Sequence, residues 1–314
     1  MQFHLNYKPK PSLIKIDHQQ KLMLVGSCFS ENIGIALQKH HFNCLVNPNG
    51  ILFNPQSIHQ SLLHCLENSS DIASHIHERE GLHFSFLHHS SISENSEQKL
   101  KALITKKQQE AHDHLKVTDV LVLTFGTAYT YFHKTQNITV ANCHKHPGTI
   151  FEKKLLSVEE IVNDYSNLID KLKSFNPKLK FIFTVSPVKY LKDGVEENNL
   201  SKATLLLAIS ELKKKFEIDY FPAYELVIDD LRDYRFYKED LAHPNDAAIK
   251  YVWEKFSDTY FTEETKKLNS ELHSINASED HKILFPESDE AKKFKETVEH
   301  KKRELKAKFS FLKF

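Results

Sequence analysis

Three short apolar runs, each followed directly by a turn-forming residue, constrain the fold of this chain more than any other feature. They are residues 22–25 before Gly26, residues 117–125 before Gly126, and residues 179–185 before Ser186 and Pro187. Runs of this kind are typical of strands that are buried on both faces, as in the centre of a parallel sheet. We therefore expect these three strands to form the middle of such a sheet.

Amphipathic helical patterns alternate with the strands. The clearest begins at the capping box Ser157-x-x-Glu160 and repeats apolar residues every three or four positions as far as Leu172. Others cover residues 97–116 and about 200–216. This alternation predicts an α/β fold with a parallel sheet flanked by helices. Because ligands bind beyond the carboxyl ends of parallel strands, the turns after the three strands mark the expected site.

Composition divides the chain at about residue 261. Residues 1–261 carry the strand and helix patterns and are expected to form one domain, with a polar, irregular insertion at 67–96. In the remainder, 262–314, the segment 288–308 is rich in lysine and glutamate and has few apolar positions. This composition predicts a charged helical C-terminal extension.

The charge balance argues against two classes of partner. Lysine and arginine number 42, aspartate and glutamate also 42, so the formal net charge is +0. No overall field therefore attracts nucleic acid or an anionic membrane. No stretch approaches the roughly 20 apolar residues of a membrane span, and residues 1–9 lack the apolar segment of a secretory signal. The four cysteines form no Cys-x-x-Cys pair, and the predicted location is the reducing cytoplasm.

The chain contains 20 histidines, which raises the question of a metal site. They are scattered, and the sequence has no His-Glu-x-x-His motif and no paired Cys/His cluster. We therefore expect no metal and no other cofactor, and we interpret most of the histidines as surface residues. The alternative is a metal held by Cys143, His144 and His146.

The turn Gly26-Ser27-Cys28 is a suitable position for a nucleophile. The first N–H groups of the helix that follows lack partners within the helix and can stabilise an anion. They favour the thiolate of a cysteine, the alkoxide of a serine and the oxyanion of a substrate. The alternative is that Ser27 or Ser30 only caps the helix while Cys28 fills an apolar gap.

A second motif, Asp240-x-x-His243, lies far downstream, directly before Pro244. Pro244 suits the first turn of a following helix. An aspartate three residues before a histidine can accept a hydrogen bond from imidazole Nδ1–H, which leaves Nε2 free as a general base. With a nucleophile in the first turn, the two motifs predict a hydrolase-type site.

In this order and context the motifs resemble those of the SGNH/GDSL hydrolase superfamily, which has Gly-Asp-Ser after its first strand and Asp-x-x-His before its last helix. More narrowly, Gly-Ser-Cys-Phe at 26–29 is similar to the Gly-Ser-Cys-Phe-Ala motif of the GSCFA family, although Ser30 occupies the last place. Further strings similar to that family are residues 125–128, 142–145, 186–188 and 201–203. The resemblance covers about residues 20–260. It implies a three-layer, flavodoxin-like sheet of the SGNH hydrolase type.

Carried over by position, the resemblance implies roles for four residues. Cys28 falls where the superfamily has its nucleophilic serine, and Ser27 falls where it has aspartate. The nucleophile is therefore Cys28 or, in a shifted register, Ser27, unless acyl transfer has been lost. A cysteine beside a histidine base is a workable pair. Asp240 and His243 match the superfamily's own Asp-x-x-His.

The oxyanion donors implied by the resemblance match less well. Gly50, in a polar turn, is the candidate for the glycine N–H of the superfamily's second block, or it simply forms an Asn-Gly turn. The third block, Gly-x-Asn-Asp, corresponds to Gly126-Thr127-Ala128, which lacks the asparagine. The Thr127 hydroxyl is one candidate to replace it.

Asn142 and His144 are further candidates for the missing donor. An amide, an imidazole and the ammonium of Lys145 close together can bind an oxyanion or a substrate carboxylate, whereas the alternative is a polar loop that satisfies itself. Lys202, in the string 201–203, is expected to open a helix and to be solvated, with substrate contact as the alternative.

The sequence thus predicts an enzyme of ester hydrolysis or acyl transfer that acts on a small-molecule or carbohydrate ester, with O-acetyl groups implied by the family resemblance. The competing interpretation is a catalytically altered protein of the same fold that binds a glycan or an acylated ligand. The missing asparagine and the unusual Ser-Cys pair favour this second interpretation.

Overall fold

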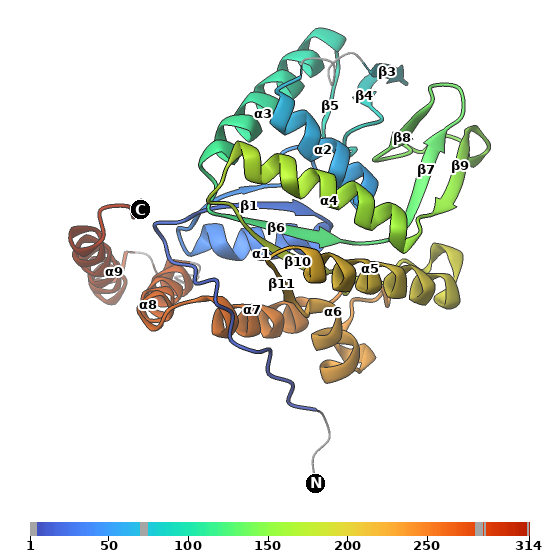
Figure 1. The fold of residues 1–314 in the computed structure, drawn as a ribbon. Coiled ribbons are helices and arrows are strands. Elements are labelled where there is room, and N and C mark those ends of the chain that lie inside the picture. The colour runs from blue at the N-terminus through green and yellow to red at the C-terminus, as the bar shows by residue number, and fades with distance from the viewer. Residues whose placement is uncertain (1–4, 70–74, 280–284, 286, 313) are drawn as a thin grey trace.

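A parallel sheet forms the centre of the computed structural model, which describes residues 5–69, 75–279, 285, 287–312 and 314. The five strands lie in the order β2-β1-β6-β10-β11 (Figure 1). They are β2 (Asn43–Val46), β1 (Lys21–Gly26), β6 (Val120–Phe125), β10 (Lys180–Val185) and β11 (Ile218–Phe221). Numbered along the chain, this is the flavodoxin-like order 2-1-3-4-5. The α/β prediction is confirmed.

The three strands predicted from the apolar runs are β1, β6 and β10. The second starts later than predicted, because Val117 belongs to the last turn of α3 (Glu97–Val117) and is 47% exposed. A β-branched residue at the end of a helix looks, in the sequence, like the first residue of the strand that follows. All residues of β6 are buried, as expected for a central strand of a parallel sheet.

Helices cover both faces of the sheet. Met23 and Val25 face the layer formed by α2 (Pro55–Glu67), α3, α4 (Val158–Phe175) and α5 (Val195–Lys215). Leu22 and Leu24 face the opposite layer, which contains α1 (Cys28–Lys39) and α7 (Asp246–Tyr260). Because neighbouring residues of a strand point to opposite faces, the molecule has three layers.

Two small antiparallel sheets extend the carboxyl end of the main sheet (Figure 1). One contains β3 (Ile76–Arg79), β4 (Leu82–Ser85) and β5 (Ser93–Glu94), within the stretch 67–96 that the sequence presents as irregular. Strands of two to four residues are too short to give a readable alternation. The other contains β7 (Tyr129–His133), β8 (Ile138–Val140) and β9 (Phe151–Leu155), with a 3-10 turn, η2 (Gly148–Ile150), before β9.

Short helical segments connect the last strand to α7. They are α6 (Ala223–Glu225), the π-helical η4 (Leu226–Leu231) and the 3-10 turn η5 (Tyr234–Phe236), while another 3-10 turn, η3 (Leu191–Asp193), precedes α5. These segments lie at the same end of the sheet as the candidate site.

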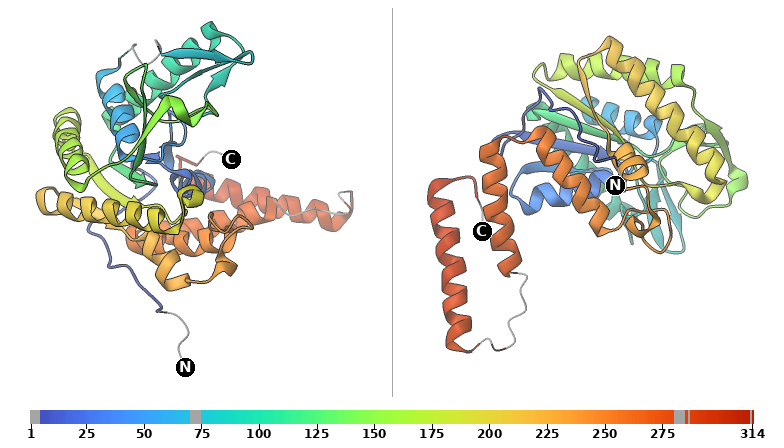
Figure 2. Two further views of the ribbon diagram at one scale, coloured as in Figure 1. Left: turned by 90° about the vertical axis from the view of Figure 1, so that its right-hand side faces the viewer. Right: turned by 90° about the horizontal axis from the view of Figure 1, so that it is seen from below.

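The C-terminal region forms a pair of helices beside the main domain (Figure 2). α8 (Glu263–Glu279) and α9 (Asp289–Lys308) bury a small apolar cluster between them, including Leu268, Leu272 and Leu305. Asn276 of α8 donates to the carbonyl of Lys39 at 2.8 Å, which ties the pair to α1. None of the helices among the described residues has the length and apolar character needed to span a bilayer.

Candidate active site

The turn before α1 is held by a close approach between β1 and β6. Gly26 has φ +147°, and a Cβ at this position would lie 2.2 Å from the carbonyl oxygen of Thr124. Only glycine fits, because L-residues rarely adopt this conformation and the space is filled by backbone. The N–H of Ser27 donates to the same carbonyl at 3.2 Å. The position of the candidate nucleophiles relative to β6 is therefore fixed by the main chain.

Ser27 and Cys28 have different environments. Ser27 is 1% exposed, and its Oγ accepts a hydrogen bond from the Phe29 N–H at 3.2 Å as the N-cap of α1. Cys28 is the first residue of α1 and is only partly buried. Burial raises the pKa of the Cys28 thiol, whereas the N–H groups of Cys28 and Phe29 and the charge of Lys202 act to lower it. The accessible candidate is thus Cys28.

Asp240 and His243 form a compact turn. Asp240 Oδ1 accepts the N–H groups of Ala242 and His243, each at 2.9 Å, and Oδ2 lies 2.6 Å from His243 Nδ1. The backbone N–H of His243 is the largest influence that lowers the pKa of Asp240, to about 2. The carboxylate is therefore ionised at neutral pH and holds the imidazole with Nε2 directed away from it.

The main chain places this turn at the carboxyl end of β10. The N–H of Lys189, just beyond β10, donates to the Ala242 carbonyl at 3.0 Å, and the N–H of Lys238 donates to the His243 carbonyl at 2.8 Å. Asn245 caps α7 through its Oδ1, which accepts from the Ala248 N–H at 3.1 Å. The two predicted motifs therefore lie at the same edge of the sheet, one after β1 and the other beside the end of β10.

The three candidate oxyanion donors named at strand ends already have partners within the protein. The Gly50 N–H donates to Asn47 O at 2.8 Å, and the Gly126 N–H donates to Phe53 O at 2.8 Å. Thr127 Oγ1 is hydrogen-bonded to Ser201 Oγ at 3.0 Å. The two glycine N–H groups would have to exchange their partners for a substrate oxygen, and Thr127 would have to do so if its hydroxyl is the donor to Ser201.

Asn142 and His144 lie in the antiparallel annex, which comprises the two small sheets β3–β5 and β7–β9 and their connecting loops, residues 75–96 and 129–155. Asn142 Oδ1 accepts the His144 N–H at 2.8 Å, and His144 Nε2 contacts the carbonyls of Ser85 at 3.0 Å and His88 at 3.2 Å. Burial lowers the pKa of His144 to about 4, and the ring stacks on Phe84 at 4.3 Å. These contacts hold the loop to β4, so their role at the oxyanion stays a prediction.

The alternative of a metal on Cys143, His144 and His146 finds no support in the geometry. Over the described parts of the chain, no group of three or more His, Cys, Asp or Glu side chains is arranged to hold a metal ion. His144 Nε2 already contacts two carbonyl oxygens, so only Nδ1 would be left to bind a metal.

The prediction of a solvated Lys202 is wrong. Its side chain is 1% exposed, and Nζ donates to the carbonyls of Gly126 at 2.6 Å and Ser186 at 2.7 Å. The cause is the start of α5, which begins at Val195 instead of about Leu200. Lys202 therefore lies two turns inside the helix and faces the sheet.

A signal for this burial exists in the sequence, because apolar and polar residues of α5 share one helical face. Asn198, Ser201 and Lys202 continue the spacing of the buried residues Leu205 and Ile209. Reading the polar residues as a start of the helix hid this pattern.

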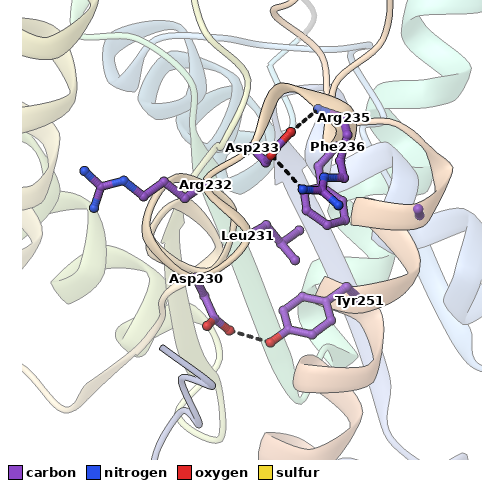
Figure 3. A pocket seen from close by; sticks show the side chains of 8 residues that line it. Asp230, Leu231, Arg232, Asp233, Arg235, Phe236 and Tyr251 are labelled. Carbon is purple, nitrogen blue, oxygen red and sulfur yellow. Dashed lines mark hydrogen bonds and ion pairs between the residues drawn. The ribbon is translucent and has the colours of Figure 1, made fainter. Parts of the chain in front are cut away.

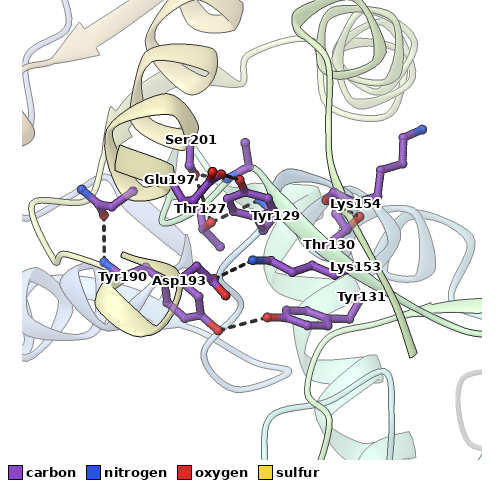
Figure 4. Close-up of polar contacts among 12 residues, drawn as sticks. Thr127, Tyr129, Thr130, Tyr131, Lys153, Lys154, Tyr190, Asp193, Glu197 and Ser201 are labelled. Carbon is purple, nitrogen blue, oxygen red and sulfur yellow. Dashed lines mark hydrogen bonds and ion pairs between the residues drawn. The ribbon is translucent and has the colours of Figure 1, made fainter. Parts of the chain in front are cut away.

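Polar contacts connect α5 to the β7–β9 sheet at the edge of the site. Figure 4 shows side chains of the sheet directed toward those of η3 and α5. The pairs are Tyr129 with Glu197, Lys153 with Asp193 at 2.7 Å, and Tyr131 with Tyr190 at 3.4 Å. These contacts fix the annex in place relative to Ser201 and Lys202.

Two pockets lie near the turn that carries His243. One pocket has a volume of about 300 Å³, and its lining includes Lys189, Asn198, Tyr224 and Tyr237. It therefore adjoins both α5, which contains Asn198, and the segment after β10 in which Lys189 holds the His243 turn. The other, of about 590 Å³, lies between η4 and α7 (Figure 3) and contains the Asp233–Arg235 ion pair. None of the candidate catalytic residues lines either pocket.

The sequence matches a family model described as the GSCFA family over residues 21–256. No curated protein matches the chain. Three solved structures cover most of it at low identity. A protein described as a GDSL-like lipase, from Parabacteroides merdae, has a TM-score of 0.40 and 14% identity, and the match covers 83% of this chain and 100% of that one.

A carbohydrate esterase of family 3 from Talaromyces cellulolyticus has a TM-score of 0.36 and 9% identity, with 81% and 99% covered. An acetyl xylan esterase from Butyrivibrio proteoclasticus has a TM-score of 0.38 and 8% identity, with 77% and 63% covered. At these TM-scores the likeness carries no argument about the reaction of this chain.

Proposed function

Since the chain belongs to the GSCFA family, we propose that the motif of that name is the nucleophile turn of a hydrolase or acyltransferase that acts on an ester. The observation that carries the proposal is the Asp240–His243 pair, joined at 2.6 Å, at the sheet edge where Cys28 begins α1. A carboxylate that orients a histidine base beside a nucleophile is the arrangement required for acyl transfer.

Cys28 is the proposed nucleophile. Its side chain is partly exposed and lies at the N-terminus of a twelve-residue helix, Cys28–Lys39, where partial positive charge favours an anion. Ser27 is buried, and its Oγ accepts the Phe29 N–H. An attack by Ser27 would remove the cap of α1 and would have to reach a substrate from a buried position.

The proposed reaction has two steps. In the first, Cys28 Sγ bonds to the acyl carbon, its proton passes to His243 Nε2 and then to the departing alkoxide, and the C–O bond breaks. In the second, His243 Nε2 accepts a proton from water or an acceptor alcohol, whose oxygen attacks the thioester carbon. The C–S bond breaks, and the released thiolate takes the proton back from Nε2. Asp240 stays ionised throughout and stabilises the imidazolium.

The oxyanion is assigned to the first turn of α1, with help from neighbouring groups. The first N–H groups of a helix have no partners within the helix and commonly stabilise anions, and Cys28 is the first residue of α1. Gly50 and Gly126 are secondary donors, because each N–H would first give up an internal hydrogen bond, and Thr127 is a secondary donor because its hydroxyl is shared with Ser201. Asn142 and His144 would contribute only after a rearrangement of the annex.

The proposed substrate is a small-molecule or carbohydrate ester, with an O-acetyl group as the first choice from the family resemblance. The 300 Å³ pocket beside Lys189 and Tyr237 is large enough for a sugar unit and adjoins the His243 turn.

A cytoplasmic location is also part of the proposal. The free thiols of Cys28, Cys44, Cys65 and Cys143 are consistent with it.

The test is hydrolysis of an aryl acetate and of an acetylated oligosaccharide by the wild type and by Cys28→Ala, Ser27→Ala and His243→Ala. We expect Cys28→Ala and His243→Ala to abolish turnover and Ser27→Ala to retain it. Iodoacetamide should label Cys28 and block the reaction. Wild-type activity no higher than that of the variants, without labelling of Cys28, would contradict the proposal for these substrates.

A second candidate function is ligand binding without turnover. The observation that favours it is that Gly50, Gly126 and Thr127 all have internal hydrogen-bond partners, as in a site that no longer stabilises an oxyanion. Calorimetric titration with an acetylated oligosaccharide discriminates the two. Binding that leaves the ester intact would support this second function.

A further inference from the structure

The 300 Å³ pocket near the His243 turn, called the Lys189 pocket below, contains two cations without anionic partners. Lys189 and Arg232 both line it. Over the described parts of the chain, neither side chain forms an ion pair with a carboxylate or donates a hydrogen bond to the protein. Cations that converge on a pocket without internal partners remain available to an anion, and charge-assisted hydrogen bonds are the strong ones. The pocket is therefore suited to a ligand that carries negative charge.

Lys189 is held in place by aromatic rings. Its Nζ lies 4.1 Å from the ring centroid of Tyr234 and 4.2 Å from that of Tyr237. Ring faces attract a cation without neutralising its charge. Tyr237 is 8% exposed and forms the floor of this contact, whereas Tyr234 is 59% exposed. The ring of Tyr234 is thus accessible to the apolar face of a sugar ring beside a fixed positive charge.

Arg232 provides the second cation from an unfavourable backbone conformation. It ends η4 with φ +50°, in the left-handed region that glycine and asparagine adopt more easily. Figure 3 shows its side chain directed away from the Asp233–Arg235 pair. An arginine kept at such a position indicates a role for the side chain. A guanidinium binds a carboxylate or a phosphate through two parallel hydrogen bonds.

The acidic side chains around the pocket do not cancel these two charges. Asp233 lines the pocket, but its Oδ1 accepts the Arg235 N–H at 2.8 Å and its Oδ2 accepts the Arg235 guanidinium at 2.9 Å. Burial, followed by the charges of Asp229 and Glu225, raises the pKa of Tyr224, so these two acids lie nearby. Neither of them lines the pocket.

Main-chain contacts join the walls of the pocket to both sides of His243. The N–H of Lys189 donates to the carbonyl of Ala242 at 3.0 Å, and Tyr237 pairs with Pro244 in an antiparallel bridge. His243 itself does not line the pocket. A ligand in the pocket therefore lies beside the imidazole and does not occupy its place, as expected for a unit that neighbours the reacting one.

We propose that the Lys189 pocket is a subsite for a sugar unit that carries a carboxylate or a phosphate group. Lys189 and Arg232 bind the anion, and Tyr234 packs against the apolar face of the ring. The acylated unit of the same substrate lies at the Cys28 and His243 site. This last assignment rests on the proposed function, whereas binding of the anionic sugar can be measured without turnover.

The test is a set of NMR titrations of the full chain with glucuronate, glucose 6-phosphate and neutral glucose. We expect at least one of the two anionic sugars to bind at least about tenfold more tightly than glucose, as charge-assisted hydrogen bonds require. The tighter of the two identifies the group as carboxylate or phosphate. Acetate and inorganic phosphate, which lack the ring, should bind more weakly than the corresponding sugar. Equal affinity for all three sugars, or for a sugar and its ringless anion, would overturn the proposal.

Variants locate the binding. Arg232→Asn removes the charge and suits the left-handed conformation, so it should keep the fold and weaken binding of the anionic sugar by about tenfold or more. Arg232→Lys should retain part of the affinity. Lys189→Gln is the second charge-removing variant, with the same expected loss. Lys192→Gln is the matched control, because Lys192 lies in η3, acts on Cys143 and does not line the pocket. Wild-type affinity in both Arg232→Asn and Lys189→Gln would overturn the proposal.

The outcomes for the subsite and for the proposed function are separable. If Cys28→Ala keeps full esterase activity while the anionic sugar binds as expected, the proposed function fails and the subsite stands. If Cys28→Ala is inactive and the anionic sugars bind no more tightly than glucose, the subsite fails and the proposed function stands.

Discussion

Two regions of the molecule contain histidines that differ in exposure and in hydrogen bonding. In the turn before α7, the side chain of His243 is 46% exposed and its Nδ1 bonds to a carboxylate. In the antiparallel annex, His88 is 1% exposed, and neither ring nitrogen has a hydrogen-bond partner among the described residues. Phe84 and Phe86 surround the neighbouring His144 and His146. A histidine oriented by an acid can transfer protons at neutral pH, whereas one packed among aromatic rings fills space.

The largest difference between the two regions is expected from His243→Ala, which should reduce turnover of an ester. We expect kcat/KM for an aryl acetate to fall by about 10³-fold or more, because both proton transfers lose their carrier. Stability should change by less than about 0.5 kcal/mol, as is usual for an exposed position. Urea unfolding and steady-state kinetics measure the two quantities. A large loss of stability would mean that His243 supports the fold, as the buried histidines of the annex do.

Asp240→Asn should have the next largest effect. The amide can still accept the backbone N–H groups of Ala242 and His243, but it can present its NH₂ to Nδ1 and no longer stabilises an imidazolium. We expect kcat to fall by about 10²-fold or more with little change in KM. Unchanged kcat would mean that His243 works without its partner, and the comparison with His88 would lose its basis.

Acid should destabilise the annex. Burial, aided by the charges of His64, His144 and Lys107, lowers the pKa of His88 to about 3 from the ordinary 6.5. Below pH 6.5 His88 binds a proton in the unfolded chain but not in the folded chain. The contribution of His88 to the free energy of unfolding is therefore complete above pH 6.5 and is lost as the pH falls toward 3. The loss should reach a few kcal/mol, on the order of 1.4 per pKa unit.

His88→Phe provides the control for the acid effect. Phenylalanine does not titrate and leaves no unsatisfied nitrogen, so the slope of unfolding free energy against pH should flatten between pH 6.5 and 4. Esterase activity at neutral pH should be unchanged. An unaltered slope would assign the acid sensitivity to other groups.

The smallest effect is expected for Ser27→Ala. Loss of an N-cap hydroxyl costs about 1 kcal/mol of stability, and activity should stay within about tenfold of the wild type because Cys28 is untouched. Thermal unfolding and aryl acetate kinetics measure the two. A loss of activity equal to that of Cys28→Ala would move the nucleophile to Ser27.

The parts of the site that the sequence predicts are those set by local interactions. Ser27, Cys28, Asp240 and His243 sit in turns whose side-chain hydrogen bonds span three residues or fewer, and the sequence shows an apolar run directly before the first of these turns. The parallel sheet follows from this run and the two similar ones. Such features need no knowledge of distant segments.

The missed features depend on distant contacts. Lys202 is buried because α5 starts earlier than its composition suggests and because two strand ends, 76 and 16 residues away, present carbonyls to it. The partner of Gly126, the carbonyl of Phe53, depends on the path of the chain between β2 and α2. The spacing within α5 indicates which face of the helix carries Lys202, but no local pattern identifies the two carbonyls that accept its hydrogen bonds.

The anchoring of the His243 turn has a consequence for how this protein can diversify. Lys189 and Ala242 meet through their main chains, as do Lys238 and His243, and main-chain contacts do not depend on which side chains those positions carry. Lys189 also lines the 300 Å³ pocket, where its Nζ lies over the rings of Tyr234 and Tyr237. For the proposed reaction, side chains that line this pocket can therefore be replaced while the imidazole keeps its place, so that specificity and proton transfer can evolve as separate traits.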